Sequence, residues 1–175
     1  MKKTIFVAGI HGVGKTYLCE SIECLGLKFA SASEIIKKEL IEANWSKDKI
    51  INDAEKNQLA LIAGVEKIRK HQDFNGLLLD GHFVLRTSNG FLSLDHAIFN
   101  ALNIDAIILV EDEAEKIASR LESRDSVSAP KDLVEFLKIE REQAEKFSAV
   151  KSLPLFLIRS GDVDKFSEVV KKIIN

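Results

Sequence analysis

The chain has 175 residues, of which 46% are hydrophobic and 30% are charged. These values are typical of a single globular domain and exclude a disordered chain. Lysine and arginine together number 25 and aspartate and glutamate 27, so the net charge is -2. This balance excludes a general nucleic-acid binder, which needs an excess of positive charge. No apolar run approaches the roughly 20 residues that cross a bilayer, so we also expect no membrane partner.

The two cysteines, Cys19 and Cys24, are five residues apart within one predicted helix. Side chains at that spacing point in different directions, which excludes a disulfide or a metal pair between them. We therefore expect reduced thiols and a cytoplasmic protein.

The pattern of apolar residues predicts short strands that alternate with helices. In chain order the predicted elements are a strand Thr4–Ala8, a helix Lys15–Leu25, a strand Leu27–Ala30, a helix Ser33–Ala43 with Ser33 as N-cap, a helix Lys49–Lys70, a strand Leu77–Leu79, a helix Leu94–Leu102, a strand Ala106–Val110, a helix Glu113–Arg124, a helix Pro130–Val150 with Pro130 as first residue, a strand Leu155–Ile158 and a helix Val163–Ile174. Strands that are short, almost wholly apolar and separated by helices indicate a parallel sheet covered on both faces. We therefore predict an α/β fold with three layers and a central five-stranded parallel sheet.

The segment Gly9–Thr16 carries the strongest signal in the chain. Its sequence GIHGVGKT fits the pattern G-x-x-x-x-G-K-[ST], between a β-branched strand and an amphipathic helix. The glycines let backbone N–H groups turn toward phosphates, Lys15 is expected to reach the β- and γ-phosphates, and the Thr16 hydroxyl is expected to bind Mg²⁺. We therefore predict an ATP site in a P-loop NTPase fold. The residues expected at this site are Gly9, His11, Gly12, Val13, Gly14, Lys15, Thr16 and Tyr17.

Asp80 ends the apolar run Leu77–Leu79, where a strand would leave the sheet beside the P-loop. Strand ends line the ligand crevice in sheets of this kind, and a carboxylate there can position Mg²⁺ through water. We therefore expect Asp80 to act with Thr16 at a Mg²⁺ site. His82, two residues further on, is a candidate contact of the molecule that accepts the phosphoryl group.

Arginine is scarce, with six residues against nineteen lysines. Arg120 and Arg124 stand four apart on one helix face, where two guanidinium groups repel each other unless an anion lies between them. A phosphoryl group in transfer is such an anion, so both are candidate catalytic residues. Pairing with nearby glutamates is the alternative. Arg86, six residues after Asp80 in a loop near the same crevice, is a candidate for holding a phosphate of the acceptor.

Several segments together resemble the archaeal-type adenylate kinases, which are small P-loop nucleoside monophosphate kinases. These segments are GIHGVGKT, NQLALIAG, LLLDGHFVLRTSNGFL, AIILVEDEAEKIASR and IRSGDVDKF. The resemblance spans nearly the whole chain and keeps the order of the parts. The P-loop is specific only for the superfamily, whereas the pattern D-x-H…T-x-x-G-[YF]-L is more specific. It falls here on Asp80, His82, Thr87, Gly90 and Phe91.

The resemblance implies transfer of a phosphoryl group from ATP to AMP, with ATP and Mg²⁺ as cofactors and small nucleotides as partners. It implies that Arg120 and Arg124 close over the transfer. It also implies that Ser33 lies at the start of the monophosphate-binding helix and that the loop with Gly161 lies against the adenine. Residues 33–72 would then be a helical excursion that binds the acceptor, and residues 120–131 a short helical lid, within one domain spanning 1–175. Family members can be oligomeric, so a homo-oligomer is compatible with this picture.

The chain departs from that family in the lid and on the acceptor side. Its lid segment SRLESRDSVSAP is shorter, and the family's D-T-H is Asp80-Gly81-His82 here. Two alternatives to an AMP kinase therefore stay open. One is a P-loop kinase whose small-molecule acceptor is not a nucleotide, and the other is a regulatory module that binds or hydrolyses ATP.

Overall fold

The computed structural model describes residues 2–42, 53–70, 73–87, 89–125 and 130–175, without the side chains of residues 53, 54, 124 and 125. The ends of the predicted helices at 43 and 49–52, and residues 126–129 of the predicted lid, lie outside this description. The elements are β1 (Lys3–Ala8), α1 (Lys15–Glu20), a 3-10 turn η1 (Glu23–Leu25), β2 (Lys28–Ser31), α2 (Ala32–Glu42), α3 (Asp53–Lys70), β3 (Gly76–Asp80), β4 (Val84–Thr87), β5 (Gly90–Ser93), α4 (His96–Ala101), β6 (Ala106–Glu111), α5 (Ala114–Asp125), α6 (Leu133–Lys151), β7 (Leu155–Arg159) and α7 (Val163–Ile174).

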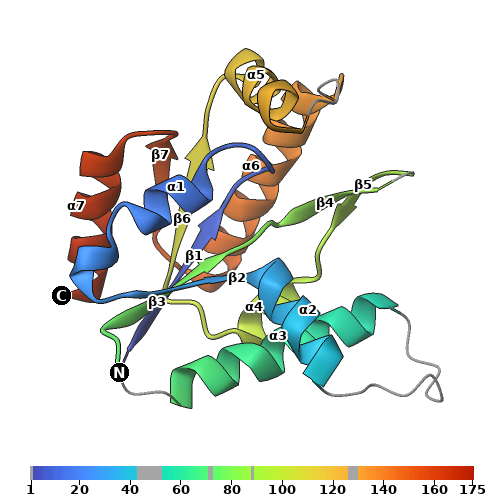
Figure 1. Ribbon diagram of the computed structural model, residues 1–175. Coiled ribbons are helices and arrows are strands. Elements are labelled where there is room, and N and C mark those ends of the chain that lie inside the picture. The colour runs from blue at the N-terminus through green and yellow to red at the C-terminus, as the bar shows by residue number, and fades with distance from the viewer. Residues whose placement is uncertain (1, 43–52, 71–72, 88, 126–129) are drawn as a thin grey trace.

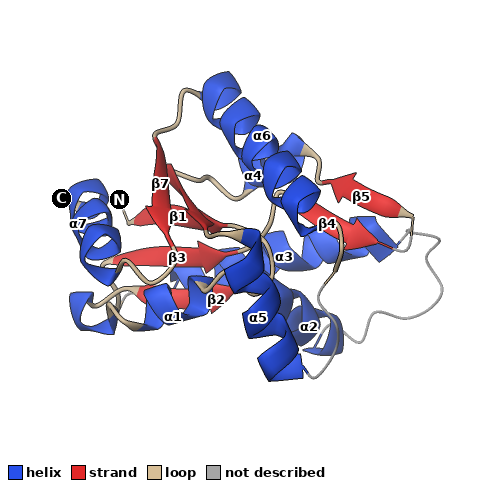
Figure 2. Ribbon diagram, turned by 90° about the horizontal axis from the view of Figure 1, so that it is seen from above, coloured by secondary structure: helices blue, strands red, loops and turns tan. Residues whose placement is uncertain are grey.

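Five strands form one parallel sheet in the order β2-β3-β1-β6-β7. The strand β1 lies at its centre, because its residues pair with β3 on one side and with β6 on the other. Helices α1 and α7 cover one face, and α4 and α6 cover the other (Figures 1 and 2). The predicted α/β fold with a central five-stranded parallel sheet and helices on both faces is confirmed.

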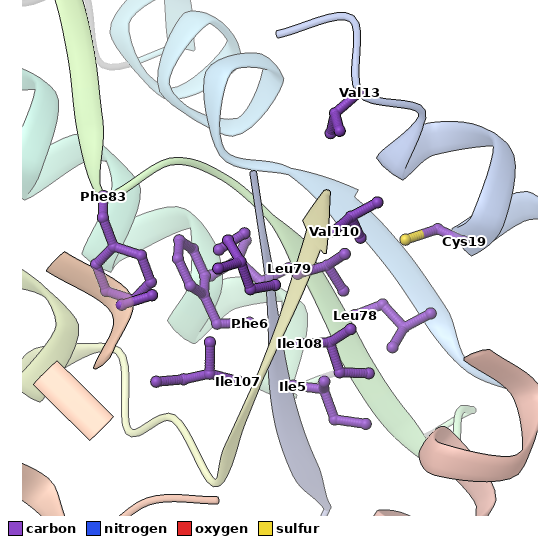
Figure 3. Close-up of a cluster of buried hydrophobic side chains, with 14 of the residues drawn as sticks. Ile5, Phe6, Val13, Cys19, Leu78, Leu79, Phe83, Ile107, Ile108 and Val110 are labelled. Atoms are coloured by element: carbon purple, nitrogen blue, oxygen red, sulfur yellow. The ribbon is translucent and has the colours of Figure 1, made fainter. Parts of the chain in front are cut away.

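The core consists of two apolar layers, one on each face of the sheet. On one face Phe6 of β1 meets Phe83 and Phe99, with ring centroids 5.1 and 5.3 Å away. On the other face lie Ile5 and Cys19, both almost fully buried (Figure 3). Apolar side chains thus alternate across β1, and burial on both sides explains why the strands are almost wholly apolar.

The structure adds an antiparallel hairpin that the sequence analysis did not predict. Strands β4 and β5 pair with Thr87 opposite Gly90, and the Thr87 hydroxyl donates to the Gly90 carbonyl oxygen at 3.0 Å. The hairpin extends away from the central sheet (Figure 1). The Asn-Gly pair at residues 89 and 90 is a known hairpin signal, and Gly90 has a φ of 109°.

Two predicted helix starts and one predicted helix end were wrong. Ser33 lies inside the first turn of α2, not at its N-cap, and its hydroxyl lies 3.0 Å from that of Ser31. Pro130 precedes α6, which begins at Leu133 after Asp132. The first helix ends at Glu20 and is followed by the 3-10 turn η1, rather than continuing to residue 25.

Both cysteines are free thiols, Cys19 buried and Cys24 exposed. Among the described residues, none of the helices combines the length and the apolar character that a membrane crossing requires.

Helices α2 and α3 pack closely at Gly64, which gives the first testable prediction. A β-carbon at Gly64 would lie 2.2 Å from a methyl carbon of Ile35 and 3.1 Å from Cγ of Glu39. Alanine in place of a helical glycine ordinarily stabilises a helix by ~1 kcal/mol. We expect Gly64→Ala to lower the melting temperature instead, because the two helices must separate.

A double-mutant cycle tests this explanation. In the Ile35→Ala background the space opposite residue 64 opens, so Gly64→Ala should become neutral or stabilising relative to Ile35→Ala alone. Circular dichroism melting of the four proteins measures the coupling. Equal effects of Gly64→Ala in both backgrounds would contradict a steric cause.

Candidate functional site

The loop Gly9–Thr16 turns from β1 into α1 at the carboxyl end of the sheet. Gly9, Gly12 and Gly14 have φ values of 141°, 82° and 100°. Leu121 of α5 lies directly against this loop, since a β-carbon at Gly12 would be 2.7 Å from a Leu121 methyl carbon. The loop therefore has the sharp turns that the motif predicts, and α5 packs against it.

The ammonium group of Lys15 lies inside the loop, and only 6% of the residue is exposed. Its Nζ donates to the carbonyl oxygens of Gly9 at 2.6 Å and Ile10 at 3.3 Å, and lies 3.5 Å from Oδ1 of Asp80. Burial lowers the pKa of Lys15, and the carboxylates of Asp80 and Glu140 act in the opposite direction. The loop thus holds a buried cation between its own carbonyl groups and a carboxylate.

Asp80 ends β3 beside the P-loop, because the strand register pairs it with Val7 of β1. Burial raises the pKa of Asp80, whereas the adjacent Lys15 lowers it. Thr16, in the first turn of α1, lines the same cavity as Asp80. A hydroxyl and a carboxylate thus share one cavity, and Mg²⁺ prefers such oxygen ligands. Within the described residues, no cluster of three or more His, Cys, Asp or Glu side chains forms a metal site.

Glu140 of α6 is a site residue that the sequence analysis missed. The residue is 1% exposed, and its carboxylate accepts hydrogen bonds from the backbone N–H groups of Gly9 at 3.2 Å, Phe83 at 3.0 Å and Val84 at 2.8 Å. Burial raises the pKa of Glu140, while these three donors oppose the change. The sequence does contain an indication that Glu140 is buried, because it lies on the same helix face as the buried residues Leu133, Phe136, Ala144 and Phe147.

His82 lines the cavity just after Asp80. Its Nδ1 is buried and has no hydrogen-bond partner among the described residues. Burial, reinforced by the positive charge of Lys15, lowers the pKa of His82 to about 3. The imidazole is therefore neutral near pH 7.

Arg120 projects from α5 and lines the cavity together with Ser119 and Ser123. Its guanidinium donates to Oδ2 of Asp112 at 2.5 Å, and the Asp112 side chain is only 2% exposed. Burial alone would raise the pKa of Asp112, but the hydrogen bonds from Arg120 and from the Glu113 backbone outweigh it, so the pKa is lowered. Arg124 lies one turn later on α5, and its side chain is outside the described part of the structure.

Three other predicted residues lie away from the cavity. Arg86 forms an ion pair with Asp132 at 3.1 Å, and it lines a separate surface depression with Lys131 and Glu135 rather than the cavity. The side chain of Val13 is fully buried in the hydrophobic core. Gly161 lies in the turn between β7 and α7, outside the described lining of the cavity.

The remaining predicted residues, apart from Gly9 and Arg124, line one cavity of about 1020 Å³. At its P-loop end the lining includes His11, Gly12, Gly14, Lys15, Thr16, Tyr17 and Arg120. The other end, which we call the apolar chamber, is lined by Ile36, Leu61, Leu85, Leu92, Ile98 and Phe99. The described lining also includes six polar side chains, those of Ser31, Ser33, Asn57, Gln58, Asp80 and His82, and Ser31 pairs with Asp80 in the sheet.

Replacement of Glu140 tests its structural role. Glu140→Ala would leave three buried N–H groups without an acceptor, and each such group costs about 1–3 kcal/mol. We therefore expect a large loss of melting temperature and weaker ATP binding in Glu140→Ala. Glu142→Ala, on the exposed side of the same helix, is the matched control and should have little effect. Similar behaviour of the two variants in thermal melts and ATP titrations would contradict the assignment.

The pKa of His82 predicts a pH dependence of stability. The folded state keeps His82 neutral down to about pH 3, whereas in the unfolded chain the group has its ordinary pKa of 6.5. Below pH 6.5 unfolding therefore takes up about one additional proton, and the free energy of unfolding falls as the pH falls. We expect His82→Gln to reduce this slope between pH 7 and pH 5 in urea titrations. An unchanged slope would contradict the burial of a neutral imidazole.

The fold is similar to that of two solved kinases. A gluconokinase from Sinorhizobium meliloti matches with a TM-score of 0.55 and 12% identity, over 98% of this chain and 91% of the other. A sugar kinase from a Janibacter species matches with a TM-score of 0.58 and 16% identity, over 99% and 95%. A sequence search of curated proteins finds no match. The profile of the AAA domain family matches residues 8–138, from the end of β1 into α6, and the chain therefore belongs to the AAA domain family.

Proposed function

We propose that the protein is an ATP-dependent kinase that transfers a phosphoryl group to a hydroxyl group of a small molecule. The observation that carries this proposal is the cavity itself, which joins a P-loop to a second compartment without a described cationic side chain. The P-loop end suits a nucleoside triphosphate, and the second compartment suits an acceptor that does not already carry a phosphate. The similarity of the fold to two sugar kinases supports a small-molecule kinase.

The donor side follows from the P-loop. Backbone N–H groups of such a loop bind phosphate oxygens, and the Lys15 ammonium neutralises charge on the phosphates. Thr16 and Asp80 have the oxygen donors that would hold Mg²⁺, Asp80 through water. Bound Mg²⁺ would supply neutralisation of the charge that develops on the phosphate oxygens.

The acceptor side lacks the charge that a phosphorylated acceptor needs. Among the described lining residues, the only lysine and arginine are Lys15 and Arg120, and both lie at the P-loop end. A monophosphate is usually held by arginine in charge-assisted hydrogen bonds. Arg86 is paired with Asp132 outside the cavity. A neutral hydroxyl compound fits these walls better than a nucleoside monophosphate.

A hydroxyl acceptor must lose a proton during the transfer. The acceptor oxygen forms a bond to the γ-phosphorus, the bond from that phosphorus to the β–γ bridging oxygen breaks, and ADP leaves. We assign the carboxylate of Asp80 as the group that takes the hydroxyl proton, because it is the only carboxylate among the described lining residues and lies 3.5 Å from the P-loop lysine. Burial raises the pKa of Asp80, which makes its carboxylate a better base.

The second candidate is the adenylate kinase reaction that the sequence resemblance implies. One observation favours it: Ser33 of α2 and Gln58 of α3 both line the cavity, within the excursion that the resemblance assigns to the acceptor. In that reaction the acceptor phosphate would have to draw on the arginines of α5 for its positive charge. The free thiols of Cys19 and Cys24 agree with the reducing cytoplasm as the location for either reaction.

The test is an ADP-release assay with product detection by mass spectrometry. The acceptors are matched pairs that differ by one charged group, adenosine with AMP and glucose with gluconate. We expect transfer to a neutral member and little transfer to its charged counterpart. AMP as the best acceptor would establish the second candidate, and ADP release without any phosphorylated product would contradict both.

Variants connect the assay to the site. Lys15→Ala should reduce transfer at least 100-fold through lost charge neutralisation, and Asp80→Asn should reduce kcat by roughly 10²–10⁴-fold, the usual contribution of a general base. Lys165→Ala, which removes an exposed lysine that pairs with Glu168 on α7, is the control and should leave the rate unchanged. Full activity of Asp80→Asn would remove this residue from the mechanism.

A further inference from the structure

We infer that the acceptor is an uncharged alcohol with a largely apolar body, which the apolar chamber holds beside the P-loop. This inference rests on the proposed function, since it names the class of molecule that accepts the phosphoryl group. It starts from the walls of the chamber, which come from α2, α3, α4 and the β4–β5 hairpin.

The floor of the chamber is rigid and apolar. Leu61, Ile98 and Phe99 are 8%, 4% and 3% exposed, and Phe99 packs against the ring of Phe6 at 5.3 Å. Packed aromatic and branched side chains of this kind keep their shape, because each contacts several buried neighbours. A ligand therefore meets a preformed apolar surface, the usual lining of a small-molecule site.

The hairpin supplies a second apolar wall that is partly exposed to solvent. Leu85 and Leu92 are directly opposite each other in the β4–β5 pairing, so both point to the same face, and both line the cavity. Their exposed fractions are 39% and 49%. Neighbouring exposed leucines on one strand pair are unfavourable in water and are typical of binding surfaces.

The opposite face of the hairpin packs against α6 and its N-terminal turn. The adjacent pair, Arg86 and Phe91, points the other way: Phe91 stacks on Phe136 of α6 at 5.1 Å, and Arg86 binds Asp132. The hairpin thus anchors one face to α6 and presents the two leucines to the cavity. The pairing register of the two strands therefore determines that Leu85 and Leu92 face the cavity.

Among the described lining residues, the polar groups closest to the P-loop by register are Asp80 and its sheet partner Ser31, with the Ser33 hydroxyl 3.0 Å from that of Ser31. Asn57 and Gln58, on the same helix as Leu61, add neutral donors and acceptors to the lining. This arrangement suits a ligand with a hydroxyl group at one end and an apolar body at the other. A polyhydroxylated chain or a sugar acid would place hydroxyl or carboxylate groups against leucine and phenylalanine without partners, at a cost of several kcal/mol.

A matched pair of fluorescent probes tests the chamber independently of catalysis. N-phenyl-1-naphthylamine is uncharged, and 8-anilino-1-naphthalenesulfonate has the same ring skeleton with an added sulfonate. Saturating ADP is present in both titrations, so that the P-loop cannot hold the sulfonate. We expect the neutral probe to bind at one site at least 10-fold more tightly than the anionic probe. Equal affinities, or tighter binding of the anion, would overturn the inference.

Two variants locate the bound probe. Leu92→Asp places a charge at the mouth of the chamber and should weaken the neutral probe at least 5-fold without changing ATP affinity. Leu157→Asp is the matched control, because Leu157 is also a strand leucine, is 50% exposed and lies outside the cavity lining. It should leave the affinity for the neutral probe unchanged. An equal loss of probe binding in both variants would show that the probe does not report on the chamber and would overturn the inference.

The acceptor assay separates this inference from the proposed function. A higher kcat/KM for 2-phenylethanol, an uncharged alcohol with an apolar body, than for ribose supports the inference. A higher kcat/KM for ribose, glucose or gluconate than for 2-phenylethanol would overturn it while leaving a hydroxyl kinase intact. If the protein fails to bind ATP, the proposed function fails, and the neutral-probe titrations of Leu92→Asp and Leu157→Asp, which need no nucleotide, still decide whether the chamber holds an uncharged apolar molecule.

Discussion

Three backbone N–H groups from two different loops converge on the buried carboxylate of Glu140. One belongs to Gly9 at the start of the P-loop, and the other two belong to Phe83 and Val84 at the start of the hairpin. Neither loop can move away without leaving a buried N–H group unpaired, which makes the arrangement rigid. The P-loop, the end of β3 and the hairpin are therefore fixed to α6 as one unit. Because the P-loop and the hairpin are both held by Glu140, the phosphate site and the apolar chamber keep a fixed distance from each other.

The charges of the site are concentrated at one end of the cavity, and each described cation there already has an anionic partner. Lys15 lies against Asp80, and Arg120 binds Asp112. A triphosphate would compete with both carboxylates for these cations. Arg159 lies 3.8 Å from Asp112, so Asp112 would keep a cationic neighbour if Arg120 turned toward a phosphate. This reduces the cost of releasing Arg120, because a buried carboxylate without a partner is strongly unfavourable.

The sequence predicted those parts of the molecule that depend on local pattern. The five strands, the parallel sheet and the positions of Lys15 and Asp80 follow from apolar runs and from one motif, because parallel strand ends meet at one edge. The sequence did not reveal the contacts between distant segments: Glu140 lies 131 residues from Gly9, and Arg86 lies 46 residues from the carboxylate that binds it. Arg86 was placed near the crevice by its distance from Asp80 along the chain, but the hairpin alternates its side chains and turns Arg86 away.

The absence of a side chain at Gly81 fits the apolar character of the chamber. A β-carbon at Gly81 would lie 2.7 Å from the ring of Phe6. Phe6 also lines the cavity, and its ring packs against Phe83 and Phe99. The side chain missing at position 81 therefore makes room for an aromatic ring beside Asp80.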